Sequence, residues 1–364
     1  MMNRKKFYDC FAKLTEQEEA CRKLYRARPE VFRQVPRNWE EFCSFFLKEN
    51  EKEEELLPAR APIEMDEWLT EESYFRSMEE YREANVIVNP RYCPPYLHKL
   101  EFIKLVYVFR GKCSFYYRGK WRELSAGSIC IVAPGVEQTV FSGSDEDIVV
   151  NYLMRRSTFT DSFSELLEIS DSGVIAEFFW KMLYHKPDGE VLIFDGGRYR
   201  LFEEAAIELY EEIYFQPHKN NLVMKSLLKI MYGYIFQQKE KDIVYPDQAA
   251  YSGTYPLMQY MNYMRRHLEC VSLKLLAAEF YVSEGWLSRY FRKESGYTFS
   301  HVLREMRMTK AAEMLVKTEC SIEKIIVTVG YQDPSIFFRN FKEMYNMTPI
   351  VYRKKKRQEV IIYM

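Results

Sequence analysis

Arginine, lysine and aromatic residues recur on one side of two short segments near the end of the chain, at spacings that suit contacts with DNA. In the first segment, 272–296, Leu287, Tyr290 and Phe291 form the apolar stripe of a helix that begins after Ser283. The opposite side of that helix carries Gly285, Trp286, Ser288, Arg289 and Arg292. An exposed helix face with arginines and one aromatic residue suits insertion into the major groove.

The second segment, 321–342, repeats the pattern with different residues. Phe337 and Phe341 are expected to be buried, and Asp333 followed by Pro334 is typical of the start of a helix. The side predicted to face outward carries Ser335, Phe338, Arg339 and Lys342. The sequence therefore predicts two recognition helices in one domain.

The elements that would hold these helices can be predicted from apolar spacing. Leu273, Leu276, Ala277 and Phe280 fall on one face of a helix before the first recognition helix, which Gly296 would end. Residues 299–317 are predicted to form one continuous helix between the two units, about 28 Å long at 1.5 Å per residue. That length approaches the roughly 34 Å between successive major-groove faces, so both units could contact one side of a duplex.

Several ordered motifs of this region resemble the AraC/XylS-type regulators. They are A-x-x-x-x-V-S-x-x-x-L-x-R-x-F-[RK]-K-x-x-G from Ala277 to Gly296, L-x-x-x-R-x-x-x-A-x-x-x-L at 303–315, V-G-[FY]-x-D-P-S-x-F-x-R-x-F-K at 329–342 and T-P-x-x-[YF]-R at 348–353. The resemblance implies seven helices, two helix-turn-helix units and contacts with two adjacent major grooves of double-stranded DNA. Ile326 departs from the alanine usual in the family, so the second unit is expected to pack more loosely. Asn346 replaces the usual glycine, but asparagine tolerates the left-handed conformation.

The outward-facing residues also have plainer interpretations. Trp286 and Phe338 could be buried, and Arg289 and Arg339 could contact only phosphates or neighbouring acids. The basic run 353–357 could be a solvated tail that adds non-specific affinity.

Residues 85–156 have a different sequence pattern, with short β-branched and aromatic runs separated by frequent turn signals such as Arg110-Gly-Lys and Pro134-Gly. This pattern predicts a small antiparallel barrel or sandwich. The region resembles the cupin-like sensor domain common in the same family, through Pro94–His98, Tyr107–Gly111, Leu124–Gly127 and Pro134-Gly.

The resemblance also locates the positions where metal-using cupins have their ligands. Here those positions hold His98, Leu100, Lys104 and Gln138, which do not form a ligand set for iron or zinc. The sequence therefore predicts no metal and no cofactor, and it offers His98, Lys104 and Gln138 as candidates to bind a polar or anionic small effector. A closed barrel without a ligand is the alternative.

Together the patterns predict an α+β multidomain chain: a cupin-like antiparallel β-barrel with flanking helices, then an all-α C-terminal domain with two helix-turn-helix units. The predicted boundaries are 1–84 for a helical N-terminal extension, 85–156 for the barrel, 157–241 for a helical dimerisation segment, 242–254 for a linker and 255–356 for the DNA-binding domain. Charge agrees with this division, because residues 251–364 hold 18 Lys and Arg against 11 Asp and Glu while the whole chain has a net charge of −1.

The sequence argues against several other classes of protein. The eight cysteines form no CxxC pair, and no GxSxG, P-loop or HExxH motif is present. No apolar run of about eighteen residues and no secretory signal are seen, so a cytoplasmic protein without membrane contact is expected. We expect a sequence-specific transcription regulator that is not an enzyme and forms a homodimer, with RNA polymerase as a further possible partner. A regulator without an effector, or a cupin enzyme fused to a DNA-binding domain, are the alternatives.

Overall fold

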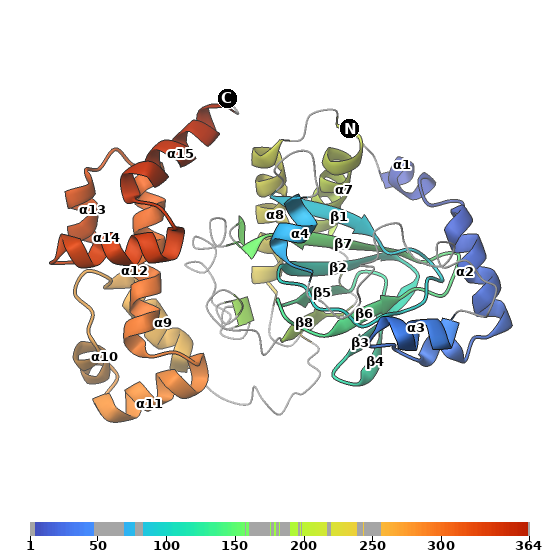
Figure 1. Ribbon diagram of the computed structural model, residues 1–364, viewed down its shortest axis with the longest axis horizontal. Helices are drawn as coiled ribbons and strands as arrows, with labels where there is room; N and C mark the ends of the chain where they lie inside the picture. The colour runs from blue at the N-terminus through green and yellow to red at the C-terminus, as the bar shows by residue number, and fades with distance from the viewer. Residues whose placement is uncertain are drawn as a thin grey trace. The chain divides into compact units, whose positions relative to one another are not determined.

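The computed structural model describes residues 4–46, 69–76, 83–156, 158–159, 175, 178–179, 182, 190–195, 197, 199–216, 220–238, 243 and 256–362. The chain divides into two compact units (Figure 1). The first comprises 1–166 and 187–252, and the second comprises 253–364 with 167–186. The predicted linker, 242–254, lies outside the described residues except for Ile243.

Two antiparallel sheets form the centre of the first unit. The larger sheet has the order β1-β7-β2-β5-β8 and the smaller the order β4-β3-β6. The strands are β1 (Ala84–Val88), β2 (Ile103–Arg110), β3 (Lys112–Tyr117), β4 (Lys120–Ser125), β5 (Ile129–Val132), β6 (Gln138–Phe141), β7 (Ile148–Met154) and β8 (Val191–Phe194). The antiparallel fold expected for 85–156 is thereby confirmed.

Strand β8 corrects one expectation, because 157–241 was predicted to be helical throughout. Val191 pairs with Val132 and Phe194 with Ile129, so β8 is the edge strand beside β5. The four apolar residues Val-Leu-Ile-Phe are too few to show a strand periodicity among helical patterns.

The register of β2 with β7 determines which side chains face the interior between the sheets. Lys104 lies opposite Leu153 and Val106 lies opposite Asn151, so all four project to the same face of the sheet. Intervening residues such as Tyr107 project to the other face, where its ring lies 4.9 Å from that of Phe202.

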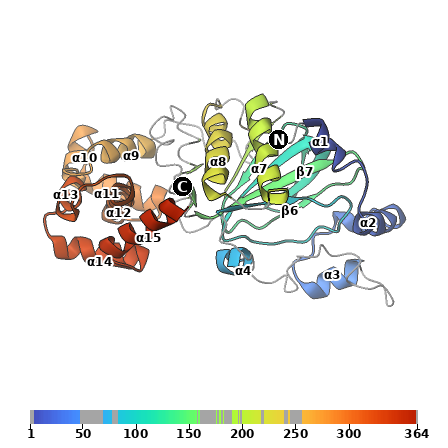
Figure 2. The same cartoon turned by 90° about the horizontal axis from the view of Figure 1, so that it is seen from above.

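Two antiparallel helices, α7 (Arg200–Tyr214) and α8 (Asn221–Phe236), cover that outer face. The Tyr152 hydroxyl donates to the carbonyl of Ala206 at 3.0 Å, which joins β7 to α7. The side chain of Asn220 accepts hydrogen bonds from the first turn of α8 and caps it. Figure 2 shows α7 and α8 on one side of the sheets and α3 and α4 on the other.

The N-terminal helices pack on the sheets as part of the same unit. They are α1 (Arg4–Asp9), α2 (Glu16–Ala27), the 3₁₀ helix η1 (Val31–Arg33), α3 (Trp39–Phe46) and α4 (Glu71–Arg76). Buried Arg91 donates to Glu18 of α2 at 2.9 Å and to the carbonyls of Phe11, Lys13 and Asp145. One arginine of the strand-rich region thus fastens both ends of the 11–18 segment.

Residues 256–362 of the second unit form seven helices. They are α9 (Pro256–Arg266), α10 (Leu273–Glu279), α11 (Glu284–Ser295), α12 (Phe299–Lys317), α13 (Ile322–Thr328), α14 (Pro334–Tyr345) and α15 (Pro349–Ile362). The bounds of α12 coincide with those expected from the sequence. The predicted caps are also confirmed, since Ser283 caps α11, Asp333 caps α14, and Gly296 and Asn346 end these helices in the left-handed conformation.

Candidate DNA interface and ligand pocket

Helices α10 and α11 form the first helix-turn-helix unit. Leu276 and Ala277 of α10 and Leu287 and Phe291 of α11 are buried between them. The five residues predicted to face outward are all exposed: Gly285, Trp286, Ser288, Arg289 and Arg292. The interpretation that Trp286 is buried is not supported, because 40% of its surface is exposed.

Tyr290 differs from its expected place in the buried stripe, because it is only partly buried. Its ring is stacked on that of Trp286, with centroids 4.9 Å apart and an interplanar angle of 15°. This stack holds the indole against the ring of Tyr290, one turn further along the same helix.

Helices α13 and α14 form the second unit on the same plan. Phe337 and Phe341 are buried, and all four residues predicted to face outward are exposed: Ser335, Phe338, Arg339 and Lys342. Phe338 is 37% exposed, which leaves its ring available for contact.

Ile336 and Tyr281 are among the exposed apolar residues that the sequence interpretation did not identify. Ile336 is 41% exposed and occupies the position in α14 that Trp286 occupies in α11. Tyr281, in the turn before α11, is 97% exposed. Aligning the buried Leu287 with Phe337 would have identified Ile336, whereas no sequence signal distinguishes Tyr281 from a partly buried turn residue.

Ile326 does not loosen the second unit as the sequence suggested. It is 3% exposed and packs in a cluster with Ile325, Phe337 and Phe341. The capping Asp333 follows Ile326 by seven residues, whereas Ser283 follows Ala277 by six. The turn of the second unit is therefore one residue longer.

Arg307 of α12 braces the two halves of this domain. Its Nε and Nη2 atoms donate to the carbonyl of Leu268 at 3.0 and 2.8 Å, and its guanidinium lies 5.5 Å from the ring centroid of Tyr331. Leu268 precedes the first unit and Tyr331 lies in the turn of the second. The 19 residues of α12, about 28 Å at 1.5 Å per residue, are therefore fixed to both units.

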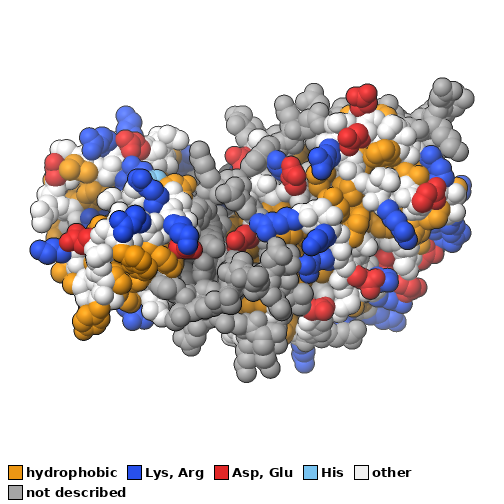
Figure 3. Space-filling model, turned by 90° about the horizontal axis from the view of Figure 1, so that it is seen from below, with side chains coloured by type: hydrophobic (Ala, Val, Ile, Leu, Met, Phe, Trp, Pro, Cys, Tyr) orange, Lys and Arg blue, Asp and Glu red, His pale blue; other side chains and the backbone are white. Residues whose placement is uncertain are grey.

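The basic run at the end of the chain is not simply a solvated tail. Arg353 donates to the carbonyl of Leu315 at 3.2 Å and to that of Cys320 at 2.6 Å, so it secures the connection between α12 and α13. Lys354 and Lys355 are exposed. In Figure 3, lysine and arginine side chains of the second unit lie beside apolar side chains on the face in view.

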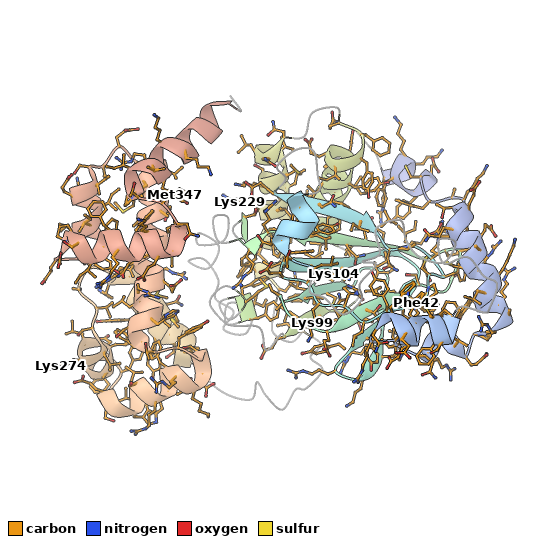
Figure 4. The ribbon with its side chains drawn as sticks, viewed as in Figure 1. Phe42, Lys99, Lys104, Lys229, Lys274 and Met347 are labelled. Carbon is orange, nitrogen blue, oxygen red and sulfur yellow. The ribbon has the colours of Figure 1, made fainter. Side chains whose placement is uncertain are left out.

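In the first unit the three predicted pocket residues form a chain of hydrogen bonds. Lys104 Nζ donates to Gln138 Oε1 at 3.1 Å, and Gln138 Nε2 lies 2.6 Å from His98 Nε2. The amide therefore donates to His98, whose Nδ1 then carries the proton and faces the carbonyl of Tyr96 at 3.2 Å. Figure 4 shows Lys104 among the strands of the first unit.

Burial determines whether His98 and Lys104 are charged. Burial, with the neighbouring Lys104 ammonium, lowers the pKa of His98 to about 3, so its ring is neutral at pH 7. Burial also lowers the pKa of Lys104 to about 8, so most of its amine stays charged at pH 7. In the described part of the chain, no carboxylate forms an ion pair with Lys104.

A cavity of about 150 Å³ lies beside these hydrogen-bonded residues. His98 and Lys104 line it together with apolar residues from α4, the strands and the loop before β2, including Tyr74, Ile87, Phe102, Val140 and Leu153. Asn151 lines it too, and its Oδ1 atom is buried without a hydrogen-bond partner. The sequence analysis did not identify Asn151, because a single asparagine in an apolar strand carries no recognisable signal.

A metal site would need several ligands in one place. Within the described ranges, no three His, Cys, Asp or Glu side chains come together in a way that could hold a metal ion.

Two family models match the chain. A helix-turn-helix domain matches residues 276–355, which contain both recognition helices, and an AraC-like ligand binding domain matches 89–193, which contain most of the residues that line the cavity. The chain belongs to the AraC family. Its two matched domains occur in the order that the sequence resemblance implies.

Individual AraC-family and related proteins are similar over different lengths. The HTH-type transcriptional regulator GadX of Escherichia coli O6:H1 is 34% identical over 89 residues, 24% of this chain and 32% of GadX. The uncharacterised HTH-type transcriptional regulator YisR of Bacillus subtilis is 22% identical over 257 residues, 69% of this chain and 85% of YisR. The C-terminal domain of AraT, a response regulator from Geobacillus stearothermophilus, is 33% identical over 28% of this chain and 86% of that domain, with a TM-score of 0.27. This chain thus spans about a third of the length of GadX.

No helix in the described segments of this AraC-family chain is both long and apolar enough to cross a membrane.

Proposed function

We propose that the protein is a sequence-specific transcription regulator that binds DNA through α11 and α14 and is controlled by a small effector in the β-domain. The observation that carries the proposal is the pair of recognition helices with exposed basic faces, held in one domain by α12 and Arg307. Non-enzymatic action agrees with the absence of recognised catalytic motifs and with relatives that are regulators.

In this proposal α11 and α14 enter two adjacent major grooves of double-stranded DNA. Arg289 and Arg339 contact base edges, since arginine pairs bidentately with guanine. Lys342 and Arg292 contact phosphates near the ends of the two helices. The remaining exposed residues of each face supply apolar and hydroxyl contacts.

The effector pocket is the cavity beside His98, Lys104 and Gln138. A neutral imidazole, an ammonium and an amide suit a polar or anionic small molecule. The regulated step would be transcription initiation, with RNA polymerase as a further partner.

The α7–α8 pair is the proposed dimer interface. Both helices expose large apolar side chains, and such a patch is typical of a protein–protein contact. These residues are Leu201, Tyr214, Phe215, Leu222, Val223 and Ile230. Residues 1–250 should therefore dimerise and 251–364 should not, which sedimentation of the two fragments would show.

DNA binding at graded salt tests the central proposal. With about 6–10 phosphates contacted, the logarithm of the association constant should fall against the logarithm of salt concentration with a slope of roughly −5 to −9. Duplexes selected from a random pool would supply the specific site, and a shuffled duplex would be the control. A flat salt response, or equal affinity for both duplexes, would contradict the proposal.

A further inference from the structure

Lys104 is a buried positive charge that lacks an anion. It is 5% exposed, and in the described segments its hydrogen-bond partner is the neutral Gln138. Removing an ammonium from water without a counter-charge costs free energy, so such groups usually have a functional reason. An ammonium has three donors, and the bond to Gln138 uses one of them.

Asn151, which lines the same cavity, has a hydrogen-bond acceptor that lacks a donor. The residue is 6% exposed, and its Oδ1 acceptor has no partner. A buried acceptor without a donor is uncommon and costly. A molecule in the cavity that donates a hydrogen bond at this point would remove that cost.

The sheet register places these two groups within reach of one small molecule. Lys104 lies opposite Leu153, and Asn151 is two residues before Leu153 on the same face of β7. Such diagonal neighbours on antiparallel strands have separations of about 7–8 Å. A small molecule that carries both a carboxylate and a hydroxyl can bridge this separation, because a hydrogen bond at each end covers part of the distance.

The cavity is small, and most of its remaining lining is apolar, with Asn89, Tyr96 and Thr139 as further polar residues. Ile87, Phe102, Val140 and Leu153 contribute hydrocarbon surface, and Tyr74 closes one side with its ring 4.9 Å from that of Phe102. A cavity of 150 Å³ accommodates about one six-membered ring. Long acyl chains and polyhydroxylated sugars do not match this combination of size and lining.

We propose that the pocket binds a compact hydroxycarboxylic acid, with its carboxylate on Lys104 and its hydroxyl donating to Asn151 Oδ1. The inference rests on the proposed function in taking this molecule to be the effector. Gln138 and His98 hold the ammonium in place, because their own hydrogen bonds are already directed along the chain to Tyr96.

The charge of Lys104 gives the site a pH dependence. Among the described residues, the titratable groups that face it are His98 from the loop before β2, Cys113 from β3 and Cys130 from β5. Burial raises the pKa of both thiols and lowers that of His98, so all three are neutral near pH 7. Affinity for the carboxylate should therefore be constant between pH 6 and 7 and fall above about 8, where Lys104 loses its proton.

Calorimetry on the full-length protein tests the ligand class directly. The probes are mandelate and the three hydroxybenzoates, with benzoate as the analogue without hydroxyl and 3-hydroxybenzyl alcohol as the analogue without charge. At least one acid should bind, and benzoate should bind about 10-fold more weakly because Asn151 then stays unpaired. The uncharged alcohol should bind about 10- to 100-fold more weakly than the corresponding acid.

Two variants separate ligand recognition from a structural role. Lys104→Met should weaken binding of the acid by the same 10- to 100-fold factor and raise the melting temperature of the free protein, because a buried charge is removed. Lys99→Met is the control at a partly exposed lysine that pairs with Glu137 and does not line the cavity, and it should change neither property (Figure 4). Asn151→Leu should abolish the preference for the hydroxy acid over benzoate.

The proposal is overturned if none of the four acids binds at millimolar concentration, if benzoate binds as tightly as they do, or if Lys104→Met lowers the melting temperature and leaves binding intact. These outcomes leave DNA binding untouched. Acids that bind without altering DNA affinity would instead refute effector control while the assigned site stands.

Discussion

The two helix-turn-helix units are built on one plan but differ at the turn. Ser272 and Ser321 cap α10 and α13 in the same way, and Val282 and Tyr331 each donate to the carbonyl five residues before, at 2.9 and 3.0 Å. Between these bonds the first unit has Tyr281 and the second has Gly330. Both residues have a positive φ, 54° and 88°.

The difference follows from what surrounds each turn. A Cβ atom on Gly330 would lie 2.6 Å from the carbonyl oxygen of Leu268 and 2.7 Å from that of Glu269. Tyr281 is almost fully exposed and meets no such obstacle. The second turn is thus specified by packing against the rest of the domain, whereas the first tolerates an aromatic residue in a strained conformation.

The largest effect expected from this comparison is that of Gly330→Val. Left-handed strain and the clash with two fixed carbonyls should together destabilise the domain by about 4 kcal/mol. Urea unfolding of 251–364 would measure it. Tyr281→Val is the matched control at the open turn and should cost less than about 1 kcal/mol. Similar losses in the two variants would show that φ alone, rather than packing, distinguishes the turns.

Ile326→Ala should cost about 3 kcal/mol, because it leaves a cavity in a cluster of fully buried residues. The reciprocal change, Ala277→Ile, should also destabilise, by about 2 kcal/mol, because Ala277 is buried and added methyl groups would overpack its surroundings. The same unfolding experiment measures both. A stabilising Ile326→Ala would revive the expectation of loose packing in the second unit.

Arg289→Ala and Arg339→Ala should each weaken binding to the specific duplex by about 1–3 kcal/mol and relax the preference at one base position. Lys342→Ala should weaken specific and shuffled duplexes about equally. Fluorescence anisotropy with single-base variants of the site would distinguish the two behaviours. If all three variants affect both duplexes alike, neither helix reads bases through these arginines.

The smallest expected effect is a gain of stability. Tyr281→Gly should stabilise 251–364 by about 1 kcal/mol, because it removes a left-handed non-glycine residue that makes little contact. Thermal unfolding would show a higher melting temperature. A loss of DNA affinity in the same variant, with unchanged stability, would assign the exposed ring to the duplex.

The sequence predicted the second unit well because its signals are local. Caps such as Ser283, the glycine at 296 and the spacing of Leu287 and Phe291 each lie within a few residues of the feature that they specify. The register of exposed and buried residues on both recognition helices follows from the same 3.6-residue period.

The features that the sequence did not predict depend on distant partners. Arg91 and Glu18 are 73 residues apart, so their buried ion pair could not be recognised, and with it the packing of the N-terminal helices on the sheets. The hydrogen-bonded residues Lys104, Gln138 and His98 were identified only because the resemblance to cupin-like domains located their positions. The unpaired oxygen of Asn151 depends on which strands face the cavity, and that register is set by long-range pairing.

The brace formed by Arg307 bears on how a binding site for this protein can change over evolutionary time. Because α11 and α14 both pack against α12, the angle between the two grooves of the proposed complex would be set by the protein rather than adjusted by a flexible link. Each base pair inserted between the contacted positions turns one groove by about a tenth of a helical turn relative to the other. If the proposed two-groove contact holds, target sites would tolerate base substitutions in small steps, while single-nucleotide insertions or deletions between the two segments would be removed by selection.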